Sequence, residues 1–279
     1  RGVLTSFWAL ETDFGLVQGN FNTLDALVTL AFDCRRPQLF RPQIFAALEL
    51  FTQNEFNPNE TKGAWAGEIG MVQMLPKDIL ENGVDADGDG KINLQSSASD
   101  ALFSAARMLK SLGWQANEPW LQEVKLAQEI DWFETGTDKK KTIGEWKNLR
   151  ITGKYSDLPD GPGDASLILP QGHKGPKFLA YSNFNVFFQW NKSFIYVLTA
   201  AHFANQLEGS PPFTPGNPDK GLNKNQMMLL QTKLKKLGYQ VGEIDGILGS
   251  KTRRSVQELQ RTLNLPADAW PTIELLETL

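Results

Sequence analysis

Apolar residues near the start of the chain recur at the spacing of a helix with one buried face. The i, i+1, i+4, i+5 pattern predicts a helix that ends near Gly15. The next position on the same stripe is Glu11, so a carboxylate lies where a core residue is expected. The apolar members of the stripe are Val3, Leu4, Phe7 and Trp8.

This placement of Glu11 has a chemical consequence. Burial penalises the charged form of a carboxyl group, and the nearby helix C-terminus adds partial negative charge. We therefore expect Glu11 to keep its proton near neutral pH. A protonated carboxylic acid in an apolar pocket can donate a proton to the leaving oxygen of a glycosidic bond. On spacing alone, a Glu at a frayed helix end that turns to water remains an equal alternative.

Two further helices are predicted after this one. Asn22 and Thr23 form a plausible cap for a helix with apolar positions from 24 to 32. Pro42 is expected to open another helix. Its apolar residues are Ile44, Phe45, Leu48 and Phe51. Both are expected to be core helices that support Glu11, and Cys34, the single cysteine, is expected to be a small core residue.

Residues 63–76 (GAWAGEIGMVQMLP) form an apolar, glycine-rich stretch that Gln73 interrupts. Small residues allow a ligand or another helix to approach the backbone closely. A buried glutamine needs hydrogen-bond partners, which a sugar could supply. We favour the wall of a cleft, although close helix packing alone would also explain the glycines.

Residues 85–93 (DADGDGKIN) match the first half of an EF-hand loop. Position 12 of such a loop is Ser96 instead of Glu, and Asp100, in the first turn of the next helix (100–112), is a candidate for the missing ligand. The alternative is a solvated Asp/Gly turn. Because closely spaced acids repel one another without a cation, we expect a structural Ca²⁺.

The pattern changes from residue 114 to about 180, where short strands and one short helix predict a mixed lobe inserted between helices. The strands are expected at 123–130, 166–169 and 177–181, and the helix at 142–149. His173 is expected to be a solvent-exposed loop residue without a role. Residues 181–209 return to helical spacing. Within them Trp190 could stack on a sugar, and Asn191 and Tyr196 have polar tips, although ordinary core packing explains all three.

Residues 209–221 carry four prolines and are predicted to link two domains, residues 1–208 and 222–279. The second domain is expected to be a compact helical binding module, with helices at 225–237 and 250–263. The fold class is thus mainly α (α+β).

Composition narrows the possible partners. The net charge of −4, with both signs interspersed, offers no basic face for nucleic acid. No apolar run reaches the ~18 residues of a membrane-spanning helix. The chain begins at Arg1 with a predicted helix, so we expect any export signal to have been removed or never present.

Several of these motifs, in this order, resemble one family. Residues 1–208 are similar to the B-type lytic murein transglycosylases of Gram-negative bacteria. The matching segments are ALETDFG (9–15), the helix at 24–32, residues 63–76, the loop at 85–93 and NFNVFFQWNKSFIY (183–196). Residues 222–279 resemble the small three-helix peptidoglycan-binding domain, through LQTKLKKLGY (230–239) and IDGILGSKTRRSVQELQ (244–260).

The resemblance implies a lysozyme-like helical catalytic domain in which Glu11 is the sole catalytic carboxylate. Glu11 would protonate the oxygen between N-acetylmuramic acid and N-acetylglucosamine, and would then deprotonate the muramoyl 6-hydroxyl, which closes on C1 to leave a 1,6-anhydro end. The resemblance also implies a cleft and a Ca²⁺ site. Gln73, Asn191 and Tyr196 would line the cleft with Trp190 and Ala64, and Asp85, Asp87, Asp89, Lys91 (by its carbonyl) and Asp100 would surround Ca²⁺.

The family resemblance further implies a monomeric periplasmic protein that binds peptidoglycan glycan strands, with outer-membrane association through a removed N-terminal segment. The chain departs from the family at Ala64, where relatives commonly have Ser, and at Asp13. An N-terminal part that contributes to the cleft in relatives is expected to be absent. Two alternatives stay open: hydrolysis by the same acid, and a murein-binding protein whose catalytic domain has decayed.

Overall fold

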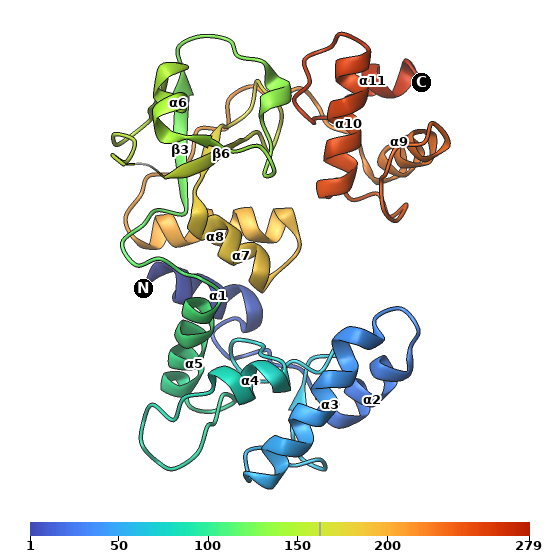
Figure 1. The fold of residues 1–279 in the computed structure, drawn as a ribbon. Coiled ribbons are helices and arrows are strands. Elements are labelled where there is room, and N and C mark those ends of the chain that lie inside the picture. Colours follow the sequence, from blue (N-terminus) through green and yellow to red (C-terminus); the bar gives the residue numbers. More distant parts are fainter. Residues whose placement is uncertain (162) are drawn as a thin grey trace. The chain divides into compact units, whose positions relative to one another are not determined.

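The computed structural model describes residues 1–161 and 163–279, which divide into two compact units. The first unit contains residues 1–115 and 200–210, and the second contains residues 116–199 and 211–279. Figure 1 shows their helices and strands. Within the described part of the chain, no helix combines the length and the apolar character needed to cross a membrane.

The first unit is helical apart from one short antiparallel ribbon. Its elements are α1 (Gly2–Thr12), β1 (Phe21–Asn22), α2 (Thr23–Phe32), α3 (Pro37–Thr52), β2 (Lys62–Gly63), α4 (Pro76–Asn82) and α5 (Ala98–Ser111). Helix α3 packs between α2 and α4, and α4 packs on α5. The core includes Phe7, Leu27, Leu50 and Val72, all at most 1% exposed.

Helix α2 follows its prediction, whereas α3 does not. Asn22 caps α2, because its side-chain oxygen accepts a hydrogen bond from Asp25 N at 2.9 Å. Helix α3 begins at Pro37, and Pro42 lies inside it, so the prediction that Pro42 opens this helix is wrong. A proline in the first turn costs no hydrogen bond, whereas Pro42 lacks one N–H donor. Packing against α2 and α4 holds the helix together through this position.

The prediction that both helices are core helices is also only partly right. The buried face of α3 combines two large apolar residues with small and polar ones, while Phe45 is 71% exposed and Phe32, at the end of α2, is 92% exposed. The buried residues of α3 are Phe40, Gln43, Ala46, Ala47 and Leu50. Cys34 is exposed, which contradicts its assignment to the core, because α2 has already ended at Phe32. Hydrophobicity alone does not tell which of two apolar faces meets a neighbour.

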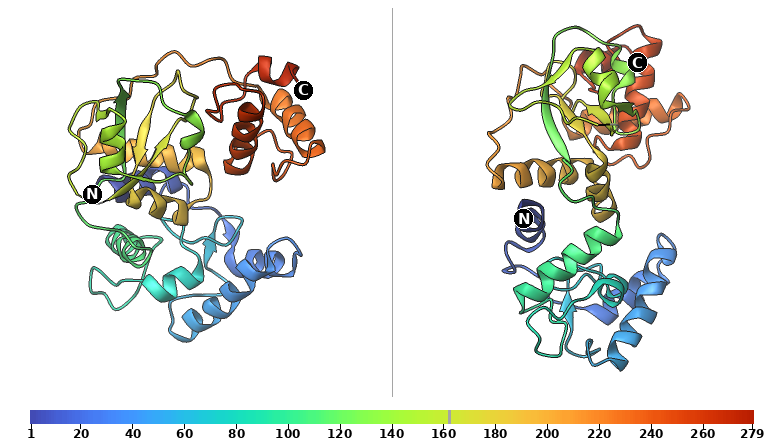
Figure 2. Two further views of the ribbon diagram at one scale, coloured as in Figure 1. Left: turned by 45° about the horizontal axis from the view of Figure 1, so that its top comes forward. Right: turned by 60° about the vertical axis from the view of Figure 1, so that its left-hand side comes forward.

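The mixed lobe lies in the second unit and is built on a five-stranded antiparallel sheet with the order β4-β6-β7-β3-β5. Its elements are β3 (Leu121–Leu126), a 3₁₀ turn η1 (Trp132–Glu134), β4 (Lys141–Thr142), α6 (Ile143–Asn148), β5 (Ile151–Gly153), β6 (Asp164–Ile168) and β7 (Phe178–Ala180). Figure 2 shows α6 beside these strands. The predicted helix and the two later strands are therefore present. The first strand ends four residues early, because its partner β5 pairs only as far as Leu126.

Trp146, on α6, anchors the core of the mixed lobe. The side chain is fully buried, and its Nε1 donates to Ala165 O at 2.9 Å. It packs in a cluster with Ile143 of its own helix and with apolar side chains of the sheet, which include Ile151, Leu167 and Leu179. A buried indole whose N–H is paired fixes the helix against the sheet.

The predicted helical stretch after the lobe is two helices, α7 (Ser182–Trp190) and α8 (Phe194–Leu207). Asn191 interrupts them, because its side-chain oxygen accepts from Ser193 N at 2.9 Å.

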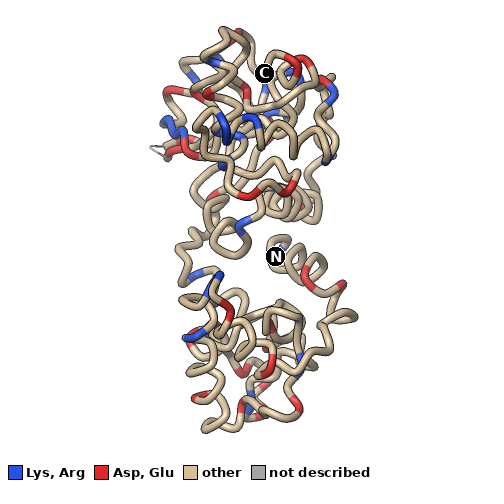
Figure 3. Tube along the Cα trace, turned by 90° about the vertical axis from the view of Figure 1, so that its right-hand side faces the viewer, with Lys and Arg blue, Asp and Glu red and all other residues tan. Residues whose placement is uncertain are grey.

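The C-terminal domain has the three expected helices, α9 (Lys224–Lys236), α10 (Ser250–Thr262) and α11 (Ile273–Glu277), around an apolar core that includes Leu230, Leu234 and Val256. Figure 3 shows acidic and basic residues interspersed along the trace, as the composition predicts.

Candidate active site

Glu11 lies in the last turn of α1 and is half-buried. The helix ends because Asp13 adopts the left-handed conformation, with φ of 49°, and Gly15 follows with φ of 90°. The hydroxyl of Thr12 donates to Met71 O at 2.6 Å and accepts from Gly15 N at 2.9 Å. These two bonds fix the end of α1, and thus the backbone of Glu11, against the 63–76 segment.

The surroundings of Glu11 on α1 are partly apolar. Phe7, one turn earlier on the same stripe, is fully buried, and Trp8 is half-buried with its ring 5.4 Å from that of Phe14. The partial burial of Glu11 lies between the two alternatives that the sequence left open. As a residue, Glu11 is neither fully buried nor exposed.

Glu68 brings a second carboxyl group into electrostatic reach of Glu11. Burial raises the pKa of Glu68 above its usual value, and the negative charge of Glu11 raises it further. Its Oε2 is sealed from solvent and has no hydrogen-bond partner among the described residues. Glu68 is not among the site residues predicted from the sequence, although a glutamate within an apolar, glycine-rich run is a signal that could identify it.

The glycines of the 63–76 segment serve close packing. Gly67 has φ of +87°, and a Cβ there would collide with Leu27 Cδ2 on α2. Gln73 also has a positive φ, of 53°, and its Nε2 donates to Gly70 O at 2.9 Å and to Gln18 O at 3.3 Å. The amide nitrogen of Gln73 therefore has protein partners without a sugar.

The remaining cleft candidates divide between the two units. Ala64 lies with Glu11 and Gln73 in the first unit, where it is half-buried and its N–H donates to Glu68 O at 2.9 Å. Trp190, Asn191 and Tyr196 belong to the second unit and are half-buried. The side-chain oxygen of Asn191 is engaged with the backbone at the end of α7.

The acidic loop brings three carboxylates together. Ligand oxygens of Asp85, Asp87 and Asp100 lie within 4.8 Å of one another. Asp100 is fully buried in the first turn of α5, and it accepts hydrogen bonds from Ala86 N and Asn93 N, both at 2.9 Å. Burial alone would raise the pKa of Asp100, but these backbone donors outweigh it and hold the pKa below its usual value.

The other two predicted ligands lie on the exposed rim of this loop. Asp89 Oδ1 accepts from Lys91 N at 2.9 Å, and both residues are exposed. Ile92, which follows them, donates its N–H to Glu55 Oε2 at 2.8 Å, which ties the loop to the chain after α3. Three carboxylates with oxygen ligands this close together suit a hard divalent cation.

A mostly helical unit with a half-buried glutamate at the end of a helix, joined to a small sheet lobe, is typical of lysozyme-like enzymes that cleave glycans. The chain belongs to the transglycosylase SLT domain family, which residues 1–205 match. Residues 223–279 match the putative peptidoglycan binding domain.

Named relatives agree with this assignment. SltB3 from Pseudomonas aeruginosa, solved in complex with NAG-anhNAM-pentapeptide and also with NAG-NAM-pentapeptide, is 35% identical, with a TM-score of 0.87 over 99% of this chain and 75% of that chain. The Escherichia coli lytic transglycosylase Slt35, solved in complex with calcium, is 26% identical, with a TM-score of 0.64 over 74% of this chain and 65% of that one.

A curated relative matches over a shorter stretch. Membrane-bound lytic murein transglycosylase B of Escherichia coli K12 is 34% identical over 113 residues, which are 40% of this chain. The match spans 31% of that relative's length.

Proposed function

We propose that this chain cleaves the β-1,4 bond between N-acetylmuramic acid and N-acetylglucosamine in peptidoglycan without consuming water, and leaves 1,6-anhydro ends. The observation that carries the proposal is the family match over residues 1–205. Glu11 lies within this range, in the last turn of α1. The relative SltB3, which binds a NAG-anhNAM-pentapeptide, supports the same product class.

In the proposed mechanism Glu11 acts twice. As general acid it gives its proton to the glycosidic oxygen while the bond from that oxygen to C1 breaks. As carboxylate it then takes the proton of the muramoyl 6-hydroxyl, whose oxygen forms the new bond to C1. The proton count balances and Glu11 ends in its starting state.

The setting of Glu11 supports its first role. Electrostatic repulsion between two carboxylates is mutual, so Glu68 opposes ionisation of Glu11 as Glu11 opposes that of Glu68. The helix C-terminus, which Asp13 closes, adds partial negative charge. Both effects favour the protonated acid that the first step requires. The hydrogen bonds of Thr12 keep the helix end in place while the proton moves.

The test replaces Glu11 by glutamine, which keeps the shape of the side chain but has no proton to donate. We expect Glu11→Gln to abolish release of anhydro-muropeptides from purified sacculi, with an unchanged circular dichroism spectrum. Asp13→Asn is the matched control, because Asp13 is an exposed carboxylate two positions away and asparagine tolerates its left-handed backbone.

The products distinguish the proposal from its alternatives by mass spectrometry. A muramidase would give reducing ends that are heavier than the anhydro product by one water. A decayed enzyme would bind sacculi and release nothing. Either result in the unmodified protein, or anhydro products from Glu11→Gln, would refute the proposed reaction.

For the substrate we propose that Gln73, Asn191, Tyr196, Trp190 and Ala64 contact the glycan strand. The aromatic side chains would stack on sugar faces and the amides would hydrogen-bond to them. The C-terminal domain would bind peptidoglycan, as the family description of residues 223–279 states. We propose a periplasmic location, because peptidoglycan lies in the periplasm of Gram-negative bacteria. We further propose that the protein acts as a monomer.

For the acidic loop we propose a structural Ca²⁺ held by Asp85, Asp87 and Asp100, with Asp89 and the carbonyl of Lys91 completing the shell. The support is the close approach of the first three carboxylates and the calcium complex of Slt35. Its role would be to fix the loop between α4 and α5, since Ca²⁺ takes six to eight oxygen ligands.

A further inference from the structure

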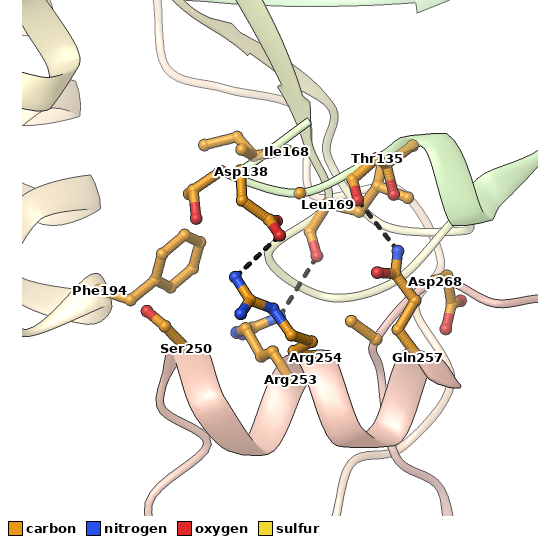
Figure 4. Close-up of a pocket in the computed structure, with 13 residues that line it drawn as sticks. Thr135, Asp138, Ile168, Leu169, Phe194, Ser250, Arg253, Arg254, Gln257 and Asp268 are labelled. Atoms are coloured by element: carbon orange, nitrogen blue, oxygen red, sulfur yellow. Dashed lines mark hydrogen bonds and ion pairs between the residues drawn. The ribbon is translucent and has the colours of Figure 1, made fainter. Parts of the chain in front are cut away.

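Side chains of helix α10, in the C-terminal domain, form hydrogen bonds with backbone oxygens of the mixed lobe. Gln257 is 5% exposed, and its Nε2 donates to Trp132 O at 3.1 Å and Thr135 O at 3.0 Å in the mixed lobe. The same nitrogen lies 3.0 Å from Ala267 O of its own domain. One buried amide thus bridges the two parts, as Figure 4 shows for Thr135.

Arg253, one turn earlier on α10, makes the second bridge. Its guanidinium donates to Pro170 O at 2.8 Å and to Leu169 O at 3.5 Å, and it lies 4.6 Å from the centre of the Phe194 ring. Burial lowers the pKa of Arg253 to about 10. A guanidinium that is buried in this way is strongly disfavoured unless its carbonyl and aromatic partners stay in place.

Asp268 makes the third bridge from the loop that follows α10. One carboxylate oxygen accepts from Gln260 Nε2 at 2.9 Å and Trp270 N at 3.0 Å within the C-terminal domain. The other accepts from His173 N at 3.0 Å and lies 2.6 Å from His173 Nδ1, in the mixed lobe. His173 is therefore hydrogen-bonded and partly buried, which corrects the prediction that it is a solvent-exposed loop residue.

The segment before the C-terminal domain is also attached along its length. In residues 211–221, which we call the strap, the Phe213 ring lies 6.1 Å from that of Phe178, and Thr214 N donates to Glu123 Oε1 at 3.0 Å. Asn217 N donates to Lys174 O at 3.0 Å. A free tether of this composition would be a solvated chain without fixed partners.

From these contacts we propose that the C-terminal domain, the strap and the mixed lobe form one rigid body, locked by Arg253, Gln257 and Asp268. Domains joined by a linker are expected to move relative to each other unless their interface is extensive. Here the interface is made by buried polar side chains whose partners lie across it, and separation would leave these groups to be resolvated. The surface of residues 223–279 would therefore keep a constant position relative to the mixed lobe while the protein works on murein.

The first experiment measures tumbling of the intact chain by ¹⁵N relaxation. If the proposal is correct, residues 223–279 show the same rotational correlation time as residues 116–181. A shorter correlation time for residues 223–279, as for a small domain on a tether, would overturn the proposal. This measurement needs no variant.

The second experiment tests the lock itself. A protease recognition sequence is inserted at the exposed Gly209–Ser210 step, and the folded protein is cut there. We expect residues 210–279 to co-elute with the rest of the chain at micromolar concentration. Arg253→Gln/Gln257→Met should raise the dissociation constant of the cut fragment by roughly 100-fold, about tenfold for each buried donor lost.

Arg254→Gln is the matched control, because Arg254 lies on the same helix in an exposed ion pair with Asp138 at 2.8 Å. An exposed pair contributes little, so its dissociation constant should change less than about fivefold. Release of the fragment from the unsubstituted protein, or equal loosening by control and double variant, would contradict the proposal. None of these measurements uses murein cleavage, so they stand apart from the proposed activity.

Discussion

Replacing Asp100 by asparagine perturbs the acidic loop at its buried carboxylate. Asp100 accepts two backbone hydrogen bonds at 2.9 Å, one on each oxygen. Asparagine keeps one acceptor oxygen and places an NH₂ group against the other N–H. A hydrogen bond to a charged group contributes about 1.5–3 kcal/mol, so we expect the free energy of unfolding without metal to fall by about that amount.

Calcium adds a second difference between the two proteins. A ligand at 100 times its dissociation constant stabilises the folded state by about 2.7 kcal/mol. At roughly 2–4 °C per kcal/mol, this predicts a rise of roughly 5–10 °C in the Tm of the unsubstituted protein on adding Ca²⁺. Asp100→Asn has lost one charge from the cluster of three and should show a much smaller rise.

The assay is thermal unfolding followed by circular dichroism, with Ca²⁺ and with chelator, for both proteins. Glu49→Gln serves as control, because Glu49 is an exposed carboxylate on α3 that lies outside the loop. No rise in the unsubstituted protein would refute the metal site. An equal rise in Asp100→Asn would show that Asp100 is not one of the ligands.

Three further outcomes follow from the structure. Burial and the charge of Glu11 raise the folded-state pKa of Glu68, so the unsubstituted protein should lose stability as pH rises through that pKa. In urea titrations, Glu68→Gln should therefore gain stability relative to the unsubstituted protein over this pH range. Below about pH 4 the two proteins should not differ in this respect, because Glu68 is then protonated in both the folded and the unfolded state. Trp146→Phe should lower the free energy of unfolding by about 1–3 kcal/mol, measured in urea, because Ala165 O loses its buried donor. Gly67→Ala should cost more than about 1 kcal/mol in the same assay, since its φ of +87° disfavours a side chain and a leucine of α2 occupies the space; an unchanged midpoint for either would contradict the packing described.

Much of the fold was predictable because its signals are local. The cap at Asn22, the first two helices of the C-terminal domain and the helix with Trp146 follow from periodicity and capping residues that act within a few positions. The wrong predictions concern features that depend on packing against other elements of the fold. Proline favours the first turn of a helix, yet Pro42 lies inside α3, where packing against α2 and α4 overrides that preference.

The candidate site shows the same division. The position of Glu11 at the end of a helix follows from the sequence, and the clustering of Asp100 with the acidic loop was inferred from spacing in a loop of known geometry. Glu68 could not be paired with Glu11 in this way, because the two are far apart in the chain and meet only through the hydrogen bonds and glycine contacts that fold the 63–76 segment against α1 and α2.

The sequence by itself determined the helical class, the family and the identity of the chemical groups, since these depend on residue type and short-range periodicity. Tertiary structure decided which apolar faces are buried and that His173 contacts Asp268. It also decided that Arg253 and Gln257 of the C-terminal domain hydrogen-bond to the mixed lobe. The physical reason is that burial and hydrogen bonding between distant residues are properties of the packed chain, and no local preference specifies the partner.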